Sequence, residues 1–419
     1  MSLKKTLSLV ALGLACQVSA QTYDANNVTV QTFAGSGFSG YVNGVGQQTM
    51  FKDPTWVVAD SRSNLFVWDY GNSQIRKITP VGEVSAFAGG GLQTSGVGTN
   101  VAIGGVGGSP PWPVAMTIGR SNTIWVVAQG GSPALYRITS NAVVTVASLP
   151  SGFLPNGICA DSIGNLYFSD LTACKIYRYT TSSTLEVFAG SGNQGSQDGV
   201  GIFTSFNSPA ALAVDLANNV YVLDGGRTLI RRIDQSQRVT TLVGNDNVNS
   251  ADGLGTAASL GHYINNSQMC FDTSGNLIIV CAASIRRVSA ANRVTTIAGA
   301  FDTLEGYANG AGSAARFRGA LGVCFSGGSI YVADTGNQRI RSISYNPAPQ
   351  PVVPANLKLQ TYAGLEITGT VGRTYQIQGS PDMTNWTTRA TLLLSSTPYQ
   401  WTDQTPVAGT KFYRAFLLP

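Results

Sequence analysis

Two short phrases recur along this chain, and their recurrence constrains its fold more than any other feature. The first is a hydrophobic alternation that ends mostly in Ala-Gly, and its six copies end at Gly35, Gly89, Ser148, Gly190, Gly244 and Gly299. The second is an alternation that ends mostly in Asp, and its six copies span 65–69, 124–128, 166–170, 220–224, 277–281 and 330–334. Regular spacing of this kind predicts six copies of one structural unit.

Each unit is predicted to form four short antiparallel strands separated by turns. In the first unit the strands cover 56–60, 65–69 and 75–79 and the strand that ends at Gly89, with Gly, Asn, Pro and Ser in the turns between them. A single four-stranded sheet cannot bury both of its faces, so the units must stack around an axis and the ring must close. The predicted fold is all-β, a six-bladed β-propeller.

The order of the phrases predicts how the ring closes. The segment Val28–Gly35 comes before the first complete unit, while the sixth unit ends after 339–345 without an outer strand of its own. We therefore expect the N-terminal strand to complete the last blade, because a broken blade would leave an unpaired edge.

The units resemble the NHL repeat. In the first unit the matching residues are Phe51, Pro54, Asp60, Asn64, Asp69, Asn72, Ile75, Arg76 and Ile78, and the sixth unit repeats the pattern at Phe317, Asp334, Asn337, Ile340, Arg341 and Ile343. The second and fifth units depart from it, with Gln129–Ser132 in place of the Asp-x-x-Asn turn and Cys281 in place of an Asp. The resemblance implies a secreted NHL propeller of bacterial type over 28–345.

The two ends of the chain are predicted to lie outside the propeller. Residues 1–20 have a basic start, the apolar run Leu7–Ala15 and a small-residue cleavage site before Gln21, as in a secretory signal peptide. Lipidation of Cys16 is the alternative, although Gly13 stands where a lipobox has a bulky apolar residue. The Pro-rich segment 346–354 is a predicted linker to a small β-sandwich at 355–419, of fibronectin type III character and accessory role.

Charge and cysteine content exclude several function classes. Charged residues are 11% of the chain and the net charge is +5, so neither nucleic acid nor another polyanion is an expected partner. Five cysteines follow the signal peptide, without a CxxC pair, and are predicted core residues. The single histidine, His262, excludes the zinc-histidine chemistry of related propeller lyases, and neither metal nor cofactor is predicted.

The candidate ligand-binding residues lie on the face that carries the loops between blades. They are polar residues of the repeated turns, polar residues that break the repeat, and aromatic residues near the inner strands: Trp56, Asp69, Asn72, Trp112, Gln129, Asn156, Asp170, Asp224, Arg227, His262, Tyr263, Asp334 and Asn337. The alternative for the Asp and Asn residues is that they bind backbone N–H groups of their own turns. The alternative for the tryptophans is packing between blades. The Arg pairs at 75–77, 230–232, 285–287 and 339–341 are predicted to form a face of solvated charges paired with nearby Asp residues.

Two function classes remain. The first is a secreted, monomeric scaffold without enzymatic activity that binds a protein, peptide or glycan outside the cytoplasm. The second is a hydrolase or lyase of the gluconolactonase-like six-bladed class, with one divalent metal in the channel. At the starts of the inner strands, Thr55, Val114, Asn156, Ala210 and Gly319 include one evident ligand type, Asn156, so the scaffold is the favoured interpretation.

Overall fold

The structure is a computed structural model that describes residues 25–103, 114–129, 133–226, 228–245, 249–261, 267–281, 283–300, 305–346, 356–360, 364–403 and 412–419. The chain divides between Asn346 and Pro347 into two compact units. The described residues form strands and short 3-10 turns, which confirms the predicted all-β class. The proposed signal peptide at 1–20 lies outside the described residues.

The first unit contains six antiparallel sheets of four or five strands in its described part, which we call blades 1 to 6. Blade 1 consists of β2 (Gly44–Val45), β3 (Pro54–Ala59), β4 (Leu65–Asp69), β5 (Gln74–Ile78) and β6 (Glu83–Gly89). Blade 2 consists of β7 (Gly96–Val97), β8 (Val114–Ile118), β9 (Ile124–Ala128), β10 (Ala134–Ile138) and β11 (Val143–Ser148). Blade 3 consists of β12 (Pro155–Ala160), β13 (Leu166–Asp170), β14 (Lys175–Tyr179) and β15 (Leu185–Ala189).

Blades 4 to 6 repeat this order. Blade 4 consists of β16 (Gly199–Val200), β17 (Pro209–Val214), β18 (Val220–Asp224), β19 (Leu229–Ile233) and β20 (Arg238–Val243). Blade 5 consists of β22 (Gly253–Leu254), β24 (Met269–Phe271), β25 (Leu277–Cys281), β26 (Ser284–Val288) and β27 (Arg293–Gly299), beside the small pair β21 (Ser250–Ala251) and β23 (Ser259–Leu260). Blade 6 consists of β28 (Gly310–Ala311), β29 (Gly322–Ser326), β30 (Ser329–Asp334), β31 (Arg339–Tyr345) and β1 (Val28–Ala34).

The inner strands form a closed ring. Neighbours in the cyclic order β3, β8, β12, β17, β24, β29 contact one another, and β29 contacts β3 again. The inner strands approach so closely that a Cβ atom on Gly157 would lie 2.2 Å from the carbonyl oxygen of Ala210 in the next blade. This ring is the architecture of a β-propeller.

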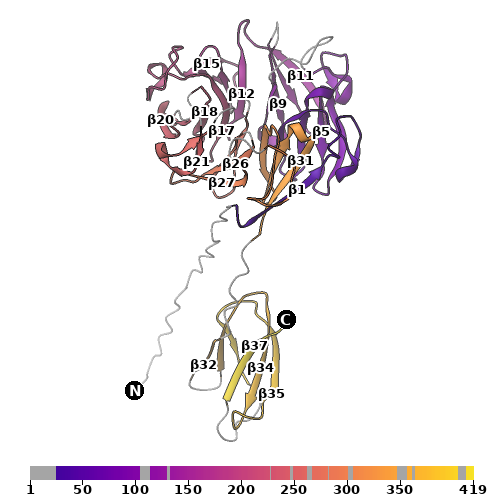
Figure 1. The fold of residues 1–419 in the computed structure, drawn as a ribbon, viewed down its shortest axis with the longest axis vertical. Helices are drawn as coiled ribbons and strands as arrows, with labels where there is room; N and C mark the ends of the chain where they lie inside the picture. The colour runs from indigo at the N-terminus through magenta and orange to yellow at the C-terminus, as the bar shows by residue number, and fades with distance from the viewer. Residues whose placement is uncertain are drawn as a thin grey trace, which may run out of the picture. The chain divides into compact units, whose positions relative to one another are not determined.

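The N-terminal strand closes the ring as predicted. Strand β1 pairs antiparallel with β31 along its whole length, from Val28 opposite Tyr345 to Ala34 opposite Ile340, and Figure 1 shows these two strands side by side. Val28, Val30 and Ala34 are buried there. The first described strand of the chain therefore completes the blade that the last strands of the propeller begin.

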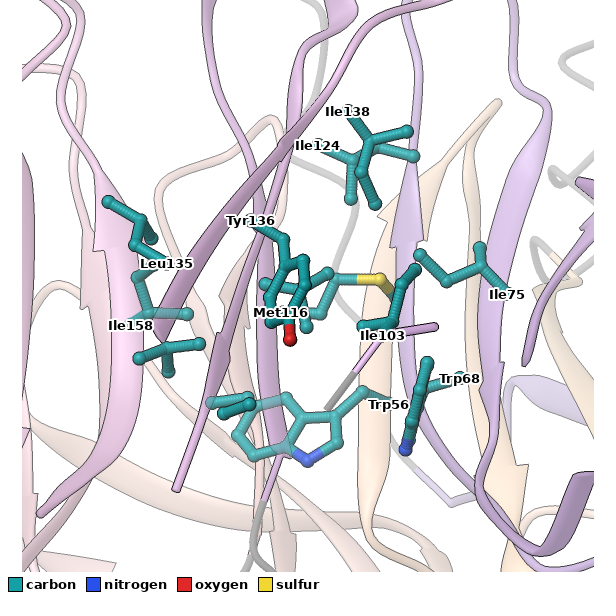
Figure 2. Close-up of a cluster of buried hydrophobic side chains, with 14 of the residues drawn as sticks. Trp56, Trp68, Ile75, Ile103, Met116, Ile124, Leu135, Tyr136, Ile138 and Ile158 are labelled. Carbon is teal, nitrogen blue, oxygen red and sulfur yellow. The ribbon is translucent and has the colours of Figure 1, made fainter. Parts of the chain in front are cut away.

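The hydrophobic core lies between neighbouring blades. One cluster joins Trp56 and Trp68 of blade 1 to Met116 of blade 2 and Phe168 of blade 3, and Figure 2 shows the labelled part of it. Alternate residues of each strand face opposite neighbours, so every blade contributes to the cores on both of its sides. The period-2 pattern in the sequence produces this packing.

The second unit consists of two three-stranded antiparallel sheets. One contains β32 (Asn356–Gln360), β33 (Gly364–Thr368) and β36 (Tyr399–Trp401), and the other contains β34 (Thr374–Ser380), β35 (Thr387–Leu393) and β37 (Phe412–Leu417). Residues of both sheets share one hydrophobic core around Ile367, Tyr375 and Ile377. The assignment of this second unit to the fibronectin type III class stays a prediction.

Candidate functional site

In several blades a buried ion pair lies at the end of the strand that follows the inner strand. These strands are β4, β18 and β30. In blade 1 the Asp69 carboxylate lies 2.8 Å from Arg76 Nη1, and both side chains are fully buried. Asp69 also accepts hydrogen bonds from Lys52 N at 2.7 Å and Asn72 Nδ2 at 2.8 Å. Burial raises the pKa of the Asp69 carboxyl, against the effect of these hydrogen bonds and of Arg76. The same pair occurs as Asp224–Arg231 at 3.3 Å and Asp334–Arg341 at 2.6 Å.

The other guanidinium nitrogen of each of these arginines binds the loop that leads into the blade. Arg76 Nη2 donates to Val42 O at 3.1 Å and to Asn43 Oδ1 at 2.7 Å. Three further arginines repeat both contacts: Arg231 with Gln197 O and Asp198, Arg286 with Ala251 O and Asp252, and Arg341 with Ala308 O and Asn309. We call these four residues the loop-binding arginines. Charge-assisted bonds from a buried, planar donor hold each loop in one conformation.

These contacts correct the prediction that the Arg pairs form a solvated face. One arginine of each pair, Arg76, Arg231, Arg286 or Arg341, is fully buried. A buried guanidinium must be paired and hydrogen-bonded. Loop residues supply partners to all four arginines, and the Asp of the turn pairs with Arg76, Arg231 and Arg341. The charge pairing was foreseen, but the burial was not.

The candidate Asp residues of the rim are buried and bind groups of the propeller itself. Asp69, Asp224 and Asp334 are fully buried, and Asp170, 2% exposed, accepts the N–H groups of Leu154, Thr172 and Ala173. The structure therefore favours the alternative that these carboxylates organise turns and loops.

The candidate Asn residues serve the same loops. Asn72 donates to Asp69 and to Gly40 O at 3.0 Å, and Asn337 donates to Asp334 and to Gly306 O at 2.8 Å. Asn156 is buried at the start of β12, and Gln129 Nε2 donates to Pro155 O at 2.7 Å. These side chains connect parts of the propeller to one another.

The aromatic candidates need one correction. Trp56 packs between blades 1 and 2 beside Trp68 and Met116 and is 6% exposed, so it offers no surface for stacking (Figure 2). The sequence pattern places Trp56 on an inner strand, where a large apolar side chain fills the space between blades. Trp112, Arg227, His262 and Tyr263 lie outside the described residues.

The central channel holds a cavity of about 220 Å³ lined by residues of all six inner strands. Gln268 lies across it: its amide accepts from Val57 N at 3.2 Å and Val323 N at 3.0 Å, and donates to Val57 O at 3.0 Å. Three free thiols, Cys159, Cys270 and Cys324, line this cavity, and burial raises the pKa of each. They occupy equivalent positions on their inner strands, opposite Tyr167, Ile278 and Tyr331.

The loops between blades expose large apolar side chains. Phe38 is 73% exposed, Leu92 79% and Phe203 76%, and each lies in a loop that leads from an outer strand to the next inner strand. Within the described ranges, no group of three or more His, Cys, Asp or Glu residues is arranged to hold a metal ion. None of the helices described is long and apolar enough to cross a membrane.

The closed ring of sheets defines the chain as a β-propeller protein. A model of the NHL repeat matches residues 317–341, which form part of blade 6. Among proteins, NHL repeat-containing protein 2 of Homo sapiens is 25% identical over 356 residues, 78% of this chain and 44% of that protein. Teneurin-1 of Mus musculus is 32% identical over 105 residues, 22% of this chain and 4% of that protein.

Among solved structures, one described as an auxiliary nutrient binding protein from Bacteroides thetaiotaomicron superposes with a TM-score of 0.56 at 19% identity, covering 77% of each chain. This likeness shows the shared fold. The chain spans less than half the length of the two relatives named above.

Proposed function

We propose that this protein is a binding scaffold without enzymatic activity, which acts outside the cytoplasm and binds a protein, peptide or glycan on the face that carries the loops between blades. The observation that carries the proposal is the set of loop-binding arginines. Each is fully buried and donates to a loop carbonyl and a loop side chain. Loops held in this way present a fixed surface.

A fixed surface favours binding because less conformational entropy is lost when the partner docks. The same loops expose Phe38, Leu92 and Phe203. Large apolar side chains on ordered loops are the kind of anchor that dominates the free energy of an interface. Rigid loops with exposed anchors thus suit recognition.

The description of one structural neighbour supports this proposal. Propellers of the same fold include one described as an auxiliary nutrient binding protein. Export through the signal peptide at 1–20 and an accessory role for the C-terminal module complete the proposal.

The test is binding of the full chain to glycan and peptide arrays, followed by a triple substitution of Phe38, Leu92 and Phe203 by Ser. We expect the strongest signal to fall at least tenfold. The matched control replaces Val81 and Leu216 by Ser. These residues are 79% and 99% exposed, and they lie in the turns between β5 and β6 and between β17 and β18, not in the loops between blades. Equal loss in both variants would overturn the assigned face. One stoichiometric divalent ion in the purified protein would instead favour the metal-dependent hydrolase or lyase.

A further inference from the structure

A second cavity of about 430 Å³ lies where the N-terminal strand closes the ring. It is lined by Thr29, Val30, Gln31, Thr32, Gln47, Asn309 and Gly310. We call it the closure groove. These residues come from β1, from the loop before blade 1 and from the loop before blade 6. Its volume falls in the range of small-ligand pockets.

At one position of the groove, blade 6 differs from blades 4 and 5: it has an asparagine, as blade 1 does at Asn43, where they have an aspartate. In blade 4 the Asp198 carboxylate accepts Thr241 N at 2.9 Å and Thr241 Oγ1 at 3.0 Å. In blade 5, Asp252 accepts Thr296 N and Oγ1 in the same way, at 3.0 and 3.1 Å. A loop carboxylate thus covers the outer edge of β20 in blade 4 and of β27 in blade 5.

In blade 6 the equivalent residues are Asn309 and Thr32. Thr32 pairs with Arg341 as Thr241 pairs with Arg231, so its N–H points away from β31 and into the groove. Asn309 Oδ1 accepts Arg341 Nη2 at 2.8 Å and lies 3.5 Å from Thr32 Oγ1, while Asn309 Nδ2 lies 3.4 Å from Tyr307 Oη. Among the described residues, no carboxylate covers the Thr32 amide.

The open edge is short. Strand β28 pairs with Thr29 and Val30 on one side of it. On the other side Gly35 N donates to Gly46 O at 3.1 Å, which brings the loop before blade 1 over the end of β1. The Thr32 hydroxyl lies 2.8 Å from Tyr307 Oη, so its side chain is covered. In the described residues the backbone edge at Gln31 and Thr32 pairs with no strand besides β31, and two residues are too short an edge for a peptide to add as a strand. The groove suits a compact ligand.

The chemistry of the lining selects a neutral ligand with many hydroxyl groups. The lining side chains are two threonines, two glutamines, an asparagine and a valine, with a glycine, and none is ionisable. Amide and hydroxyl groups both donate and accept hydrogen bonds, as sugar hydroxyls do. A charged ligand would lose hydration there without gaining an opposite charge.

We infer that the closure groove binds a neutral sugar unit of a glycan, through the amides of Gln31, Gln47 and Asn309 and the backbone N–H of Thr32. This inference rests on the proposed binding function and names a ligand class and a second site for it. The groove lies at the outer edge of blade 6, and Phe38, Leu92 and Phe203 are not among its lining residues.

The experiment uses the full chain on an array of neutral, uronic and sulfated oligosaccharides beside a peptide array, followed by calorimetric titration of the strongest neutral sugar. Asn309→Asp restores the carboxylate of blades 4 and 5, which would accept the Thr32 N–H and close the groove. We expect this variant to weaken sugar binding about tenfold or more, the loss of one or two hydrogen bonds. Gln47→Ala should also weaken it, and Asp198→Asn in blade 4, the matched control, should leave it unchanged. Equal melting temperatures show that the variants fold.

The outcomes separate this inference from the proposed function. Neutral sugar binding that is indifferent to Asn309→Asp and Gln47→Ala overturns the groove as the site but leaves the scaffold standing. Binding of peptides or charged glycans alone overturns the ligand class and leaves the scaffold standing. An absence of binding on every array overturns both.

Discussion

Blades 3 and 4 are neighbours in the ring, yet they hold their loops by different chemistry. In blade 4, Arg231 on β19 binds the loop residues Gln197 and Asp198. In blade 3 the equivalent position on β14 is Tyr177, whose ring packs edge-on against Phe153 of the preceding loop, with centroids 5.0 Å apart. Phe153 also packs on Phe168. An apolar cluster thus replaces an ion pair.

The loops explain the difference. The loop before blade 4 adds a fifth strand and brings backbone carbonyls over the blade, and these need a buried donor. The loop before blade 3 runs from Leu149 to Leu154, and in the described residues that blade has four strands. Both blades keep the Asp at the end of the second strand, as Asp170 and Asp224, because each binds a backbone N–H of its loop. Both blades therefore use this carboxylate to hold the loop. The residue on the next strand differs: Arg231 on β19 contacts the longer loop, and Tyr177 on β14 contacts the shorter one.

The largest expected effect is the loss of ring closure, on which the packing of all blades depends. A chain that begins at Ser36 lacks β1 and leaves β31 as an unpaired edge. Burial of Val28, Val30 and Ala34 contributes about 5 kcal/mol, and the strand pairing adds to this. We expect a large fall in the melting temperature of the propeller. An unchanged melt would contradict the role of β1.

The next prediction tests the ion pair that holds the loop before blade 4. Arg231→Met leaves Asp224 buried without its cation, and removing one partner of a buried pair costs about 3–5 kcal/mol. Denaturant unfolding measures the loss. Arg238→Met, an exposed arginine in the same blade, is the matched control and should change stability by less than about 0.5 kcal/mol. Similar values for the two variants would show that Arg231 is not a structural cation.

Phe153→Ala tests the apolar cluster that holds the loop before blade 3. Phe153 is 5% exposed, and its removal opens a cavity against Phe168 and Tyr177, for a loss of about 3 kcal/mol. Limited proteolysis should then cut the loop before blade 3 and spare the loop before blade 4. Cleavage of both loops at equal rates would mean that the two blades are not held independently.

The smallest effect appears at alkaline pH. Burial, and then the neighbouring Asp170, raise the pKa of Tyr177 above its ordinary value of 10.0. The folded state therefore holds the phenol proton more tightly than the unfolded state, so this contribution to stability is complete below pH 10 and is lost as the pH rises through the raised pKa. Tyr177→Phe should reduce the fall in stability between pH 9 and pH 11. An identical pH profile for wild type and Tyr177→Phe would refute the prediction.

The repeated phrases were sufficient to predict the propeller and its closure, because strand period and turn residues act locally. The displaced copy at Val28–Gly35 located the closing strand, and the pairing of β1 with β31 confirms it. The same phrases misled the assignment of a binding rim. The Asp recurs in four blades, as Asp69, Asp170, Asp224 and Asp334, because there its buried carboxylate accepts a backbone N–H of the loop. Its repetition therefore has a structural cause.

The burial of the arginines could not be deduced from charge alone, because an Arg in an alternating strand looks the same whether it faces water or a neighbouring blade. One signal was present. The Asn or Asp of each loop precedes its arginine by a nearly constant interval, from Asn43 to Arg76 and from Asp198 to Arg231 by 33 residues in both cases. The closure groove could not be predicted from the sequence, because Gln31, Gln47 and Asn309 come from distant segments that only the fold brings together.

Hydrogen exchange of the loop before blade 4, residues 190–208, tests the central claim most directly. If Arg231 holds this loop, Arg231→Met should lower the protection of its amides, including Asn207 N that donates to Asp224, while the amides of the loop before blade 3 keep theirs. Unchanged protection of residues 190–208 in a folded Arg231→Met protein would contradict the claim that buried arginines fix the loops.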